Sequence, residues 1–264
     1  LYSDAQKGMP SGGRMNILLI AGQSNAVGTS RTGPLKGYEF SNVSLYQAGE
    51  FTGGNQALQN VWLRGIRPNM GYTPEHSGIE LGICSALRGA EPYGIIRYAY
   101  GTTDLIRNWQ AESLWKKVPA SMEDSGYCFL QWKNTFLRAV HSLQTPFIVR
   151  GLVFMQGESD AYDRDGALRY AENLRSLMRD MRRFIGNESL PVLIGEIATP
   201  VSEYAPFADI VREGQREFCR GDKNAVFVPS KDLRLQDGWH YIMQDAIELG
   251  ERFGREVKNL FEKP

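Results

Sequence analysis

Apolar and polar positions divide the chain into short, continuous hydrophobic runs and longer amphipathic segments. The runs lie at 15–21, 93–100, 147–155, 191–198 and 225–229. The first run stops at Gly22, and a short apolar run that ends at a turn residue is typical of a strand buried on both faces. We therefore expect these runs to be strands of a parallel sheet.

Helical patterns lie between the runs. The clearest covers 166–185, where apolar side chains recur at three- and four-residue steps among charged ones: Leu168, Ala171, Leu174, Leu177, Met178 and Met181. Similar patterns lie near 78–89, 204–220 and 242–260. The alternation of apolar strands with amphipathic helices predicts an α/β fold around a central parallel sheet.

Two long stretches, 28–75 and 102–127, are irregular and rich in loop residues. In α/β enzymes, long excursions after strands lie at the carboxyl edge of the sheet, where ligands bind. We expect one domain over 15–264, elaborated by these two loops and preceded by a loose polar leader over 1–14.

Charge and cysteine content narrow the class of protein. Lys and Arg number 30, as do Asp and Glu, so a surface built mainly for nucleic acid is not expected. The three cysteines, Cys84, Cys128 and Cys219, are far apart and form no C-x-x-C pair, which indicates neither a zinc cage nor a disulfide scaffold. One disulfide with a free thiol and three reduced thiols both stay open. No apolar run approaches the roughly 18 residues that cross a bilayer.

Ser24 is the first candidate for chemistry. It lies in Gly22-Gln23-Ser24-Asn25, directly after the first predicted strand. A serine at a sharp turn from strand to helix exposes its hydroxyl, and the free N–H groups at the helix start can stabilise a negative oxygen. A serine in this place can equally be a helix N-cap.

A serine nucleophile needs a base, and the chain has three histidines. His141 lies in an amphipathic segment that predicts a helix, and His76 lies in a polar loop. His240 follows Asp237 by three residues, just before the last predicted helix. A carboxylate at this spacing can hold the Nδ1–H of the imidazole and leave Nε2 free to take the serine proton.

Two further polar segments end apolar runs. Gln156-Gly157-Glu158-Ser159-Asp160 follows the run 147–155, and Tyr100-Gly101-Thr102-Thr103-Asp104 ends the run 93–100. Polar groups at the end of a buried strand are costly unless they have partners or a task. The Gln156 amide and the Gly101 N–H are candidate donors to an oxyanion, although Glu158 and Asp160 can also simply begin a helix.

Together, these segments resemble the SGNH (GDSL-like) hydrolase superfamily, and more narrowly its branch of sialate O-acetylesterases and carbohydrate esterase family 6. That branch has Gly-Gln-Ser-Asn, here 22–25, in place of Gly-Asp-Ser-Leu. Its later blocks read Gln-Gly-Glu-x-Asp, here 156–160, and Asp-Gly-x-His before a helix, here 237–240. The resemblance extends from about residue 15 to residue 258.

The resemblance implies a flavodoxin-like, three-layer α/β/α sandwich with Ser24 as nucleophile, His240 as general base and Asp237 orienting the histidine. It also implies an oxyanion hole made by the N–H groups of Ser24 and Gly101 and the side chain of Gln156.

Two segments depart from the pattern of the branch. Relatives usually have Gly-Gly-Thr or Gly-Gly-Ser where this chain has Tyr100-Gly101-Thr102, and we align Gly101 with the second glycine. Relatives also often have Gly-Pro-Glu where this chain has Gly78-Ile79-Glu80. We therefore expect Glu80 to be structural.

The function that the resemblance implies is hydrolysis of O-acetyl esters on a carbohydrate through an acyl-enzyme, with no metal or other cofactor. Xylan, sialic acid and a surface polysaccharide are all open as the acetylated partner, and such substrates favour a secreted or periplasmic enzyme. The sequence does not identify the arginines that would pair with a sialate carboxylate, although Arg97 and Arg107 flank the second block. Expected substrate contacts are Gln23, Thr102, Trp109, Glu158 and Trp239.

Two alternatives remain at this point. One is a lipase-like enzyme, general short-chain esterase or thioesterase on the same fold. The other is a carbohydrate-binding module without catalysis. The tryptophans and polar residues of the loops favour a sugar over a long acyl chain, because aromatic rings beside polar groups suit sugars, although the five tryptophans can equally be packing residues.

Overall fold

The computed structural model describes residues 14–262, so the predicted leader lies outside the described residues except for Arg14. The principal strands are β1 (Met15–Gly22), β3 (Phe40–Gly49), β4 (Trp62–Ile66), β6 (Tyr93–Ala99), β7 (Phe147–Met155), β8 (Val192–Gly195) and β9 (Ala225–Val228). Within the described residues they form one seven-stranded sheet in the order β4-β3-β6-β1-β7-β8-β9. Neighbouring strands run parallel except β3 and β4, which are antiparallel.

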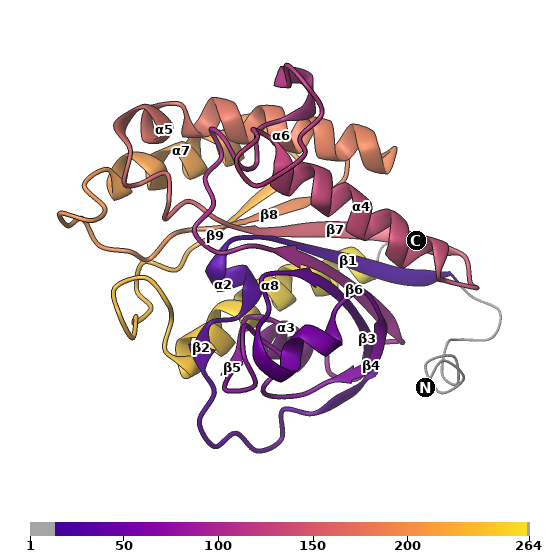
Figure 1. The fold of residues 1–264 in the computed structure, drawn as a ribbon. Coiled ribbons are helices and arrows are strands. Elements are labelled where there is room, and N and C mark those ends of the chain that lie inside the picture. Colours follow the sequence, from indigo (N-terminus) through magenta and orange to yellow (C-terminus); the bar gives the residue numbers. More distant parts are fainter. Residues whose placement is uncertain (1–13, 263–264) are drawn as a thin grey trace.

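Helices cover both faces of this sheet (Figure 1). One face carries α4 (Tyr127–His141), α5 (Arg164–Leu168), α6 (Tyr170–Ile185) and α7 (Ala208–Gly221), and the other carries α3 (Glu80–Ala86) and α8 (Met243–Phe261). When β3 and β4 are set aside, the order β6-β1-β7-β8-β9 is 2-1-3-4-5 in chain order, which is the flavodoxin-like arrangement. The predicted three-layer α/β/α sandwich is therefore confirmed.

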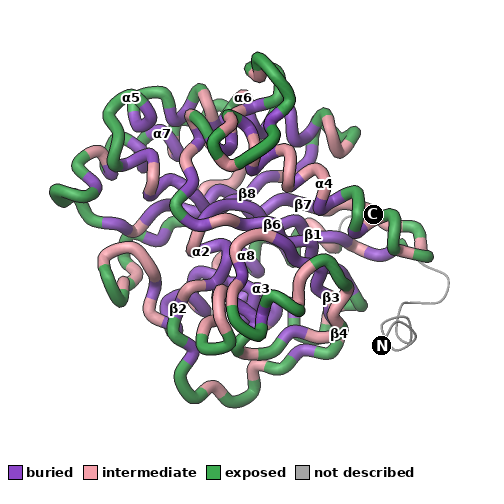
Figure 2. The backbone as a smooth tube through the Cα atoms, viewed as in Figure 1, coloured by how far each residue is buried: buried purple, intermediate pink, exposed green. Residues whose placement is uncertain are grey.

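The five apolar runs form β1, β6, β7, β8 and β9. Figure 2 shows the middle of the sheet buried, where β6 and β8 are buried throughout and β1 at all but one residue. Successive side chains of β1 enter opposite cores: Ile17 and Leu19 pack with α4 and α6, whereas Leu18 and Ile20 pack with α3 and α8. A strand that is buried on both faces has no polar side, which explains its unbroken hydrophobic run.

The expectation that 28–75 is irregular was wrong for part of that stretch. It contains β3, β4, the 3-10 helix η1 (Gly53–Leu58) and the short strand β2 (Ser30–Arg31), which pairs with β5 (His76–Ser77) just after the stretch. Polar residues interrupt β3 and hide its strand pattern. One of them, Gln47, is fully buried because its side-chain oxygen accepts a hydrogen bond from Arg97. In the stretch 102–127 the structure has only the short η2 (Glu112–Leu114).

Glu80 has the structural role that we expected. Its Oε2 accepts a hydrogen bond from the Arg97 guanidinium at 2.9 Å, its Oε1 accepts one from the Gly78 N–H at 3.0 Å, and both charged side chains are fully buried. Arg97 also donates to the Met70 carbonyl at 2.9 Å. A buried charge pair holds together because removing either partner would leave the other charge unpaired in the core.

Close packing of α3 on α8 depends on two glycines. A side chain at Gly82 would overlap the Ile247 carbonyl of α8, and one at Gly250 would overlap the Ile79 carbonyl just before α3. These helices therefore touch backbone to backbone and form a rigid layer beneath the sheet.

Cys84, Cys128 and Cys219 are free thiols, the first two buried and the third partly buried. Of the two open alternatives, the structure therefore has the one without a disulfide. Across residues 14–262 no helix combines the length and the apolarity that a membrane span requires.

Candidate functional site

Ser24 lies at the carboxyl edge of the sheet, where β1 passes into the single-turn helix α2 (Ser24–Val27). Gly22, just before it, has φ 142°, and any side chain there would overlap the Met155 carbonyl at the end of β7. The Gln23 N–H donates to that same carbonyl at 2.9 Å. The chain therefore turns sharply against β7, and Ser24 is left partly exposed.

Asp237 and His240 form a hydrogen-bonded pair in the loop before α8. His240 Nδ1 lies 2.7 Å from Asp237 Oδ2, and Asp237 Oδ1 accepts the N–H groups of Trp239 at 3.0 Å and His240 at 2.8 Å. Burial raises the pKa of Asp237, but the hydrogen bonds from His240 and Trp239 outweigh it and hold that pKa below its usual value. An ionised Asp237 keeps the proton on Nδ1 and leaves Nε2 as the basic nitrogen.

Ser24 and His240 open on one pocket of about 670 Å³. Four of the expected substrate contacts, Gln23, Thr102, Glu158 and Trp239, also line it. The remaining lining residues are Asp104, Ile106, Arg107, Ser159, Tyr162, Asp163 and Tyr204. A pocket of this size and mixed character is typical of a small-molecule site.

Asn25 connects the separate segments of this site. Its Nδ2 donates to Oε1 of Glu158, a residue that follows β7, at 2.6 Å. The same nitrogen donates at 3.0 Å to the carbonyl of Trp239, in the loop that carries His240. Burial raises the pKa of Glu158, which is 2% exposed. The second oxygen of Glu158 has no hydrogen-bond partner among the described residues.

The N–H of Gly101 is near the serine but has a partner. It donates to Glu50 Oε2 at 2.8 Å, and a methyl group built on Gly101 would lie 3.7 Å from Ser24 Cβ. Glu50 follows β3 and is partly buried. The Glu50 carboxylate therefore accepts a hydrogen bond from the Gly101 N–H, which we expected to donate to an oxyanion.

Gln156 is fully buried behind the pocket and does not line it. Its Nε2 donates to the Thr103 carbonyl at 2.8 Å and to Asp160 Oδ2 at 2.6 Å, and lies 3.3 Å from Gln23 Oε1. An amide has two N–H groups, so the two shorter bonds already use both. Gln156 thus forms a buried polar layer with Thr103 and Asp160, next to Gln23.

Thr102 has φ 55°, a left-handed conformation that a β-branched residue adopts only at a cost of about 1–3 kcal/mol. It is exposed and lines the pocket. Strain of this kind is characteristic of functional sites, where the surrounding structure imposes a backbone geometry that the residue does not prefer.

Trp109 corrects one expectation, because it cannot contact a substrate. Its side chain is fully buried, its indole N–H donates to Thr103 Oγ1 at 3.0 Å, and its ring packs edge-on against Tyr98 and Phe154. The other two histidines also lie away from the pocket lining: His141 is exposed on α4, and His76 contacts Thr73 Oγ1 at 2.6 Å through Nδ1.

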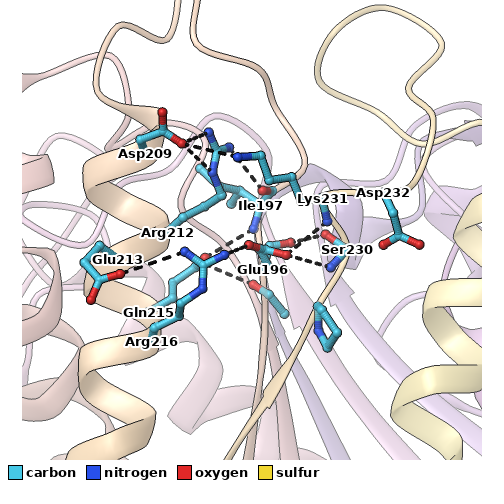
Figure 3. Close-up of polar contacts among 12 residues, drawn as sticks. Glu196, Ile197, Asp209, Arg212, Glu213, Gln215, Arg216, Ser230, Lys231 and Asp232 are labelled. Atoms are coloured by element: carbon cyan, nitrogen blue, oxygen red, sulfur yellow. Dashed lines mark hydrogen bonds and ion pairs between the residues drawn. The ribbon is translucent and has the colours of Figure 1, made fainter.

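Sequence reasoning missed a polar network that anchors the segment carrying Asp237 and His240 (Figure 3). Glu196, directly after β8, accepts the N–H groups of Ser230 and Lys231 at 3.0 Å each and also binds Arg216. Ser230 Oγ contacts the Tyr241 hydroxyl at 2.7 Å. Both ends of the segment 230–241 are thereby fixed. A glutamate inside the apolar run 191–198 was the available signal.

Comparison with known proteins identifies the family of the chain. The family model described as "Carbohydrate esterase, sialic acid-specific acetylesterase" matches residues 14–259. A protein of Arabidopsis thaliana named "Probable carbohydrate esterase" is 26% identical over 159 residues, which cover 60% of this chain and 52% of the relative. The match thus spans about half the length of that relative.

Solved structures show the same fold. A structure of an Arabidopsis thaliana protein has a TM-score of 0.71 at 19% identity, covering 94% of this chain and 99% of its own. NanS has a TM-score of 0.66 at 15% identity, covering 95% and 98%. A carbohydrate acetylesterase from Xanthomonas citri has a TM-score of 0.59 at 19% identity, covering 90% and 55%. The match of the family model over nearly the whole described chain shows that the chain belongs to the family of carbohydrate esterases described as sialic acid-specific acetylesterases.

Proposed function

We propose that the protein is a serine esterase that removes acetyl groups from a carbohydrate, with Ser24 as nucleophile and Asp237 and His240 as its base. The observation that carries this proposal is the shared pocket of Ser24 and His240, with His240 Nδ1 held 2.7 Å from Asp237. Membership of a carbohydrate esterase family supports the class of substrate.

The reaction follows from these positions. Ser24 Oγ attacks the acetyl carbonyl while His240 Nε2 takes the hydroxyl proton, and Asp237 stabilises the imidazolium that forms. The tetrahedral intermediate collapses, the C–O bond to the sugar breaks, and His240 returns the proton to the leaving sugar oxygen. Water, deprotonated by His240, then attacks the acetyl-Ser24 ester and releases acetate.

For the oxyanion we propose the N–H groups of Ser24 and Gly101 as the direct donors. The carbonyl oxygen of the substrate would displace Glu50 from the Gly101 N–H. We propose that Gln156 is a positioning residue, which holds the Thr103 carbonyl and the Asp160 carboxyl group, because these two groups use both of its N–H groups.

Glu50→Gln is expected to raise kcat by about three- to tenfold. The native carboxylate competes for the Gly101 N–H and repels the developing negative charge, whereas a neutral amide of the same size competes less. Initial rates on 4-nitrophenyl acetate at saturating substrate measure this change. A fall in kcat would show that Glu50 instead holds Gly101 in its working position.

The chain-length preference tests the proposal against a lipase-like enzyme or thioesterase. The pocket is lined by several charged and hydroxyl side chains, which do not suit a long alkyl chain. We expect 4-nitrophenyl acetate to be hydrolysed faster than the octanoate and decanoate, and acetate to be released from an acetylated oligosaccharide. Preference for the long esters would support the lipase-like alternative, and tight sugar binding without acetate release would support a binding module.

A further inference from the structure

The pocket beside Ser24 is acidic. Three carboxyl groups line it, those of Asp104, Glu158 and Asp163. Among the described residues that line it, Arg107 is the single lysine or arginine, and its guanidinium lies 3.3 Å from Asp104 Oδ2. The one permanent positive charge of the pocket is therefore already balanced by a neighbouring carboxylate.

The other arginine that flanks the second block is not available to a substrate. Arg97 is fully buried on the far side of β6, where Glu80, Gln47 and the Met70 carbonyl accept its hydrogen bonds. A substrate carboxylate entering the pocket would meet the carboxylates of Asp104 and Asp163 and no unpaired guanidinium among the residues that line it. Like charges that share a pocket oppose binding.

Glu158 offers a group that fits an uncharged, hydroxyl-rich ligand. One of its oxygens is fixed by Asn25, and the other is buried without a hydrogen-bond partner in the part of the chain that the structure describes. Glu158 itself is one of the residues that line the pocket. A buried acceptor that lacks a partner costs free energy, which a donor hydroxyl of a ligand would recover. Sugars supply such hydroxyls next to an acetylated position.

The rim of the pocket provides apolar surface for the ring of a sugar. Tyr162 is 67% exposed and Tyr204 is 61% exposed, and both line the pocket with the partly buried Trp239. Exposed aromatic faces cost free energy in water and pack well against the C–H face of a pyranose, while the phenol hydroxyls remain solvated.

We infer that the acetylated sugar is uncharged, and that the free oxygen of Glu158 accepts a hydrogen bond from one of its unacetylated hydroxyls. This inference rests on the proposed function and narrows its substrate. It separates the protein from a sialate-specific enzyme, because a sialic acid would bring its carboxylate into an acidic pocket.

The test compares kcat/KM for a mono-O-acetylated methyl xyloside and for O-acetyl-N-acetylneuraminic acid, with acetate as the readout. We expect the neutral sugar to be preferred by about tenfold or more, a ratio equal to about 1.4 kcal/mol. Equal rates, or preference for the sialate, would overturn the inference and leave the esterase proposal intact. If neither sugar is deacetylated while 4-nitrophenyl acetate is hydrolysed, the carbohydrate part of the proposed function fails as well.

Two variants test the named groups. Asp163→Asn removes a pocket charge but preserves the cap of α5, since an asparagine oxygen can still accept the Gly166 N–H. It should raise the ratio of sialate to xyloside hydrolysis about threefold or more, whereas Glu188→Gln, at an exposed site outside the pocket, should leave that ratio unchanged. An unchanged ratio in Asp163→Asn would contradict the electrostatic argument.

Glu158→Gln keeps an oxygen for Asn25 and replaces the free acceptor with a donor. We expect it to raise KM for the xyloside more than KM for 4-nitrophenyl acetate, which has no sugar hydroxyl to donate. Equal changes in the two KM values would indicate that Glu158 only positions Asn25, and would overturn its assignment as a substrate contact.

Discussion

Ser24→Ala is expected to lower kcat by about 10⁴-fold or more on both 4-nitrophenyl acetate and an acetylated sugar. Without the hydroxyl no acetyl-enzyme can form, and water would have to attack the ester directly. Substrate affinity should change little, because the pocket lining otherwise stays the same. The thermal midpoint should also be retained, since Ser24 is partly exposed and its side chain fills no core position.

Ser159→Ala is the matched control, because Ser159 is the second serine that lines the pocket. Its N–H, which contacts Gln23 Oε1 at 3.4 Å, remains in the variant, so we expect a loss below about tenfold. Burst kinetics with 4-nitrophenyl acetate would report the acetyl-enzyme directly. If Ser24→Ala stays active and Ser159→Ala does not, the nucleophile lies on the segment after β7.

His240→Ala is expected to reduce kcat by a comparable factor, about 10³- to 10⁵-fold, because no group would then remove the proton of Ser24. Asp237→Ala should cost less, since the imidazole would keep its place but lose the partner that fixes its tautomer. The measurement is kcat at a pH where an imidazole is neutral, with circular dichroism to confirm the fold.

His141→Ala provides the comparison for this variant. The residue is exposed in the last turn of α4 and does not line the pocket, so its loss should leave turnover nearly intact. A collapse of kcat in His141→Ala without unfolding would mean that the general base is a different histidine from the one proposed.

The core of the fold could be predicted because its strands are buried on both faces. Such strands cannot alternate, so the run 147–155 predicted β7 to the residue. β3 was not predicted because polar residues interrupt it and the buried one depends on a partner far away in the sequence: Gln47 is compatible with a core only beside Arg97. No local pattern contains that information.

The same distinction applies to the site. Asp237 and His240 lie three residues apart, so their contact could be predicted from the spacing in the sequence alone. The approach of Glu50 to Gly101 joins the ends of two neighbouring strands, and the burial of Trp109 depends on rings from β6 and β7. Both required the sheet order, which the one-dimensional pattern does not provide.

The bonds from Asn25 to Trp239 and Glu158 have a consequence for biosynthesis. The segment with Ser24 leaves the ribosome early, whereas the segment with Asp237 and His240 follows β9 and emerges only shortly before α8. A nascent chain that has completed β7 can therefore hold Ser24 in place and still lack its base. Acetate release would begin only once α8 has docked on α3. The appearance of esterase activity in a translation reaction would therefore report when folding is complete, not when it begins.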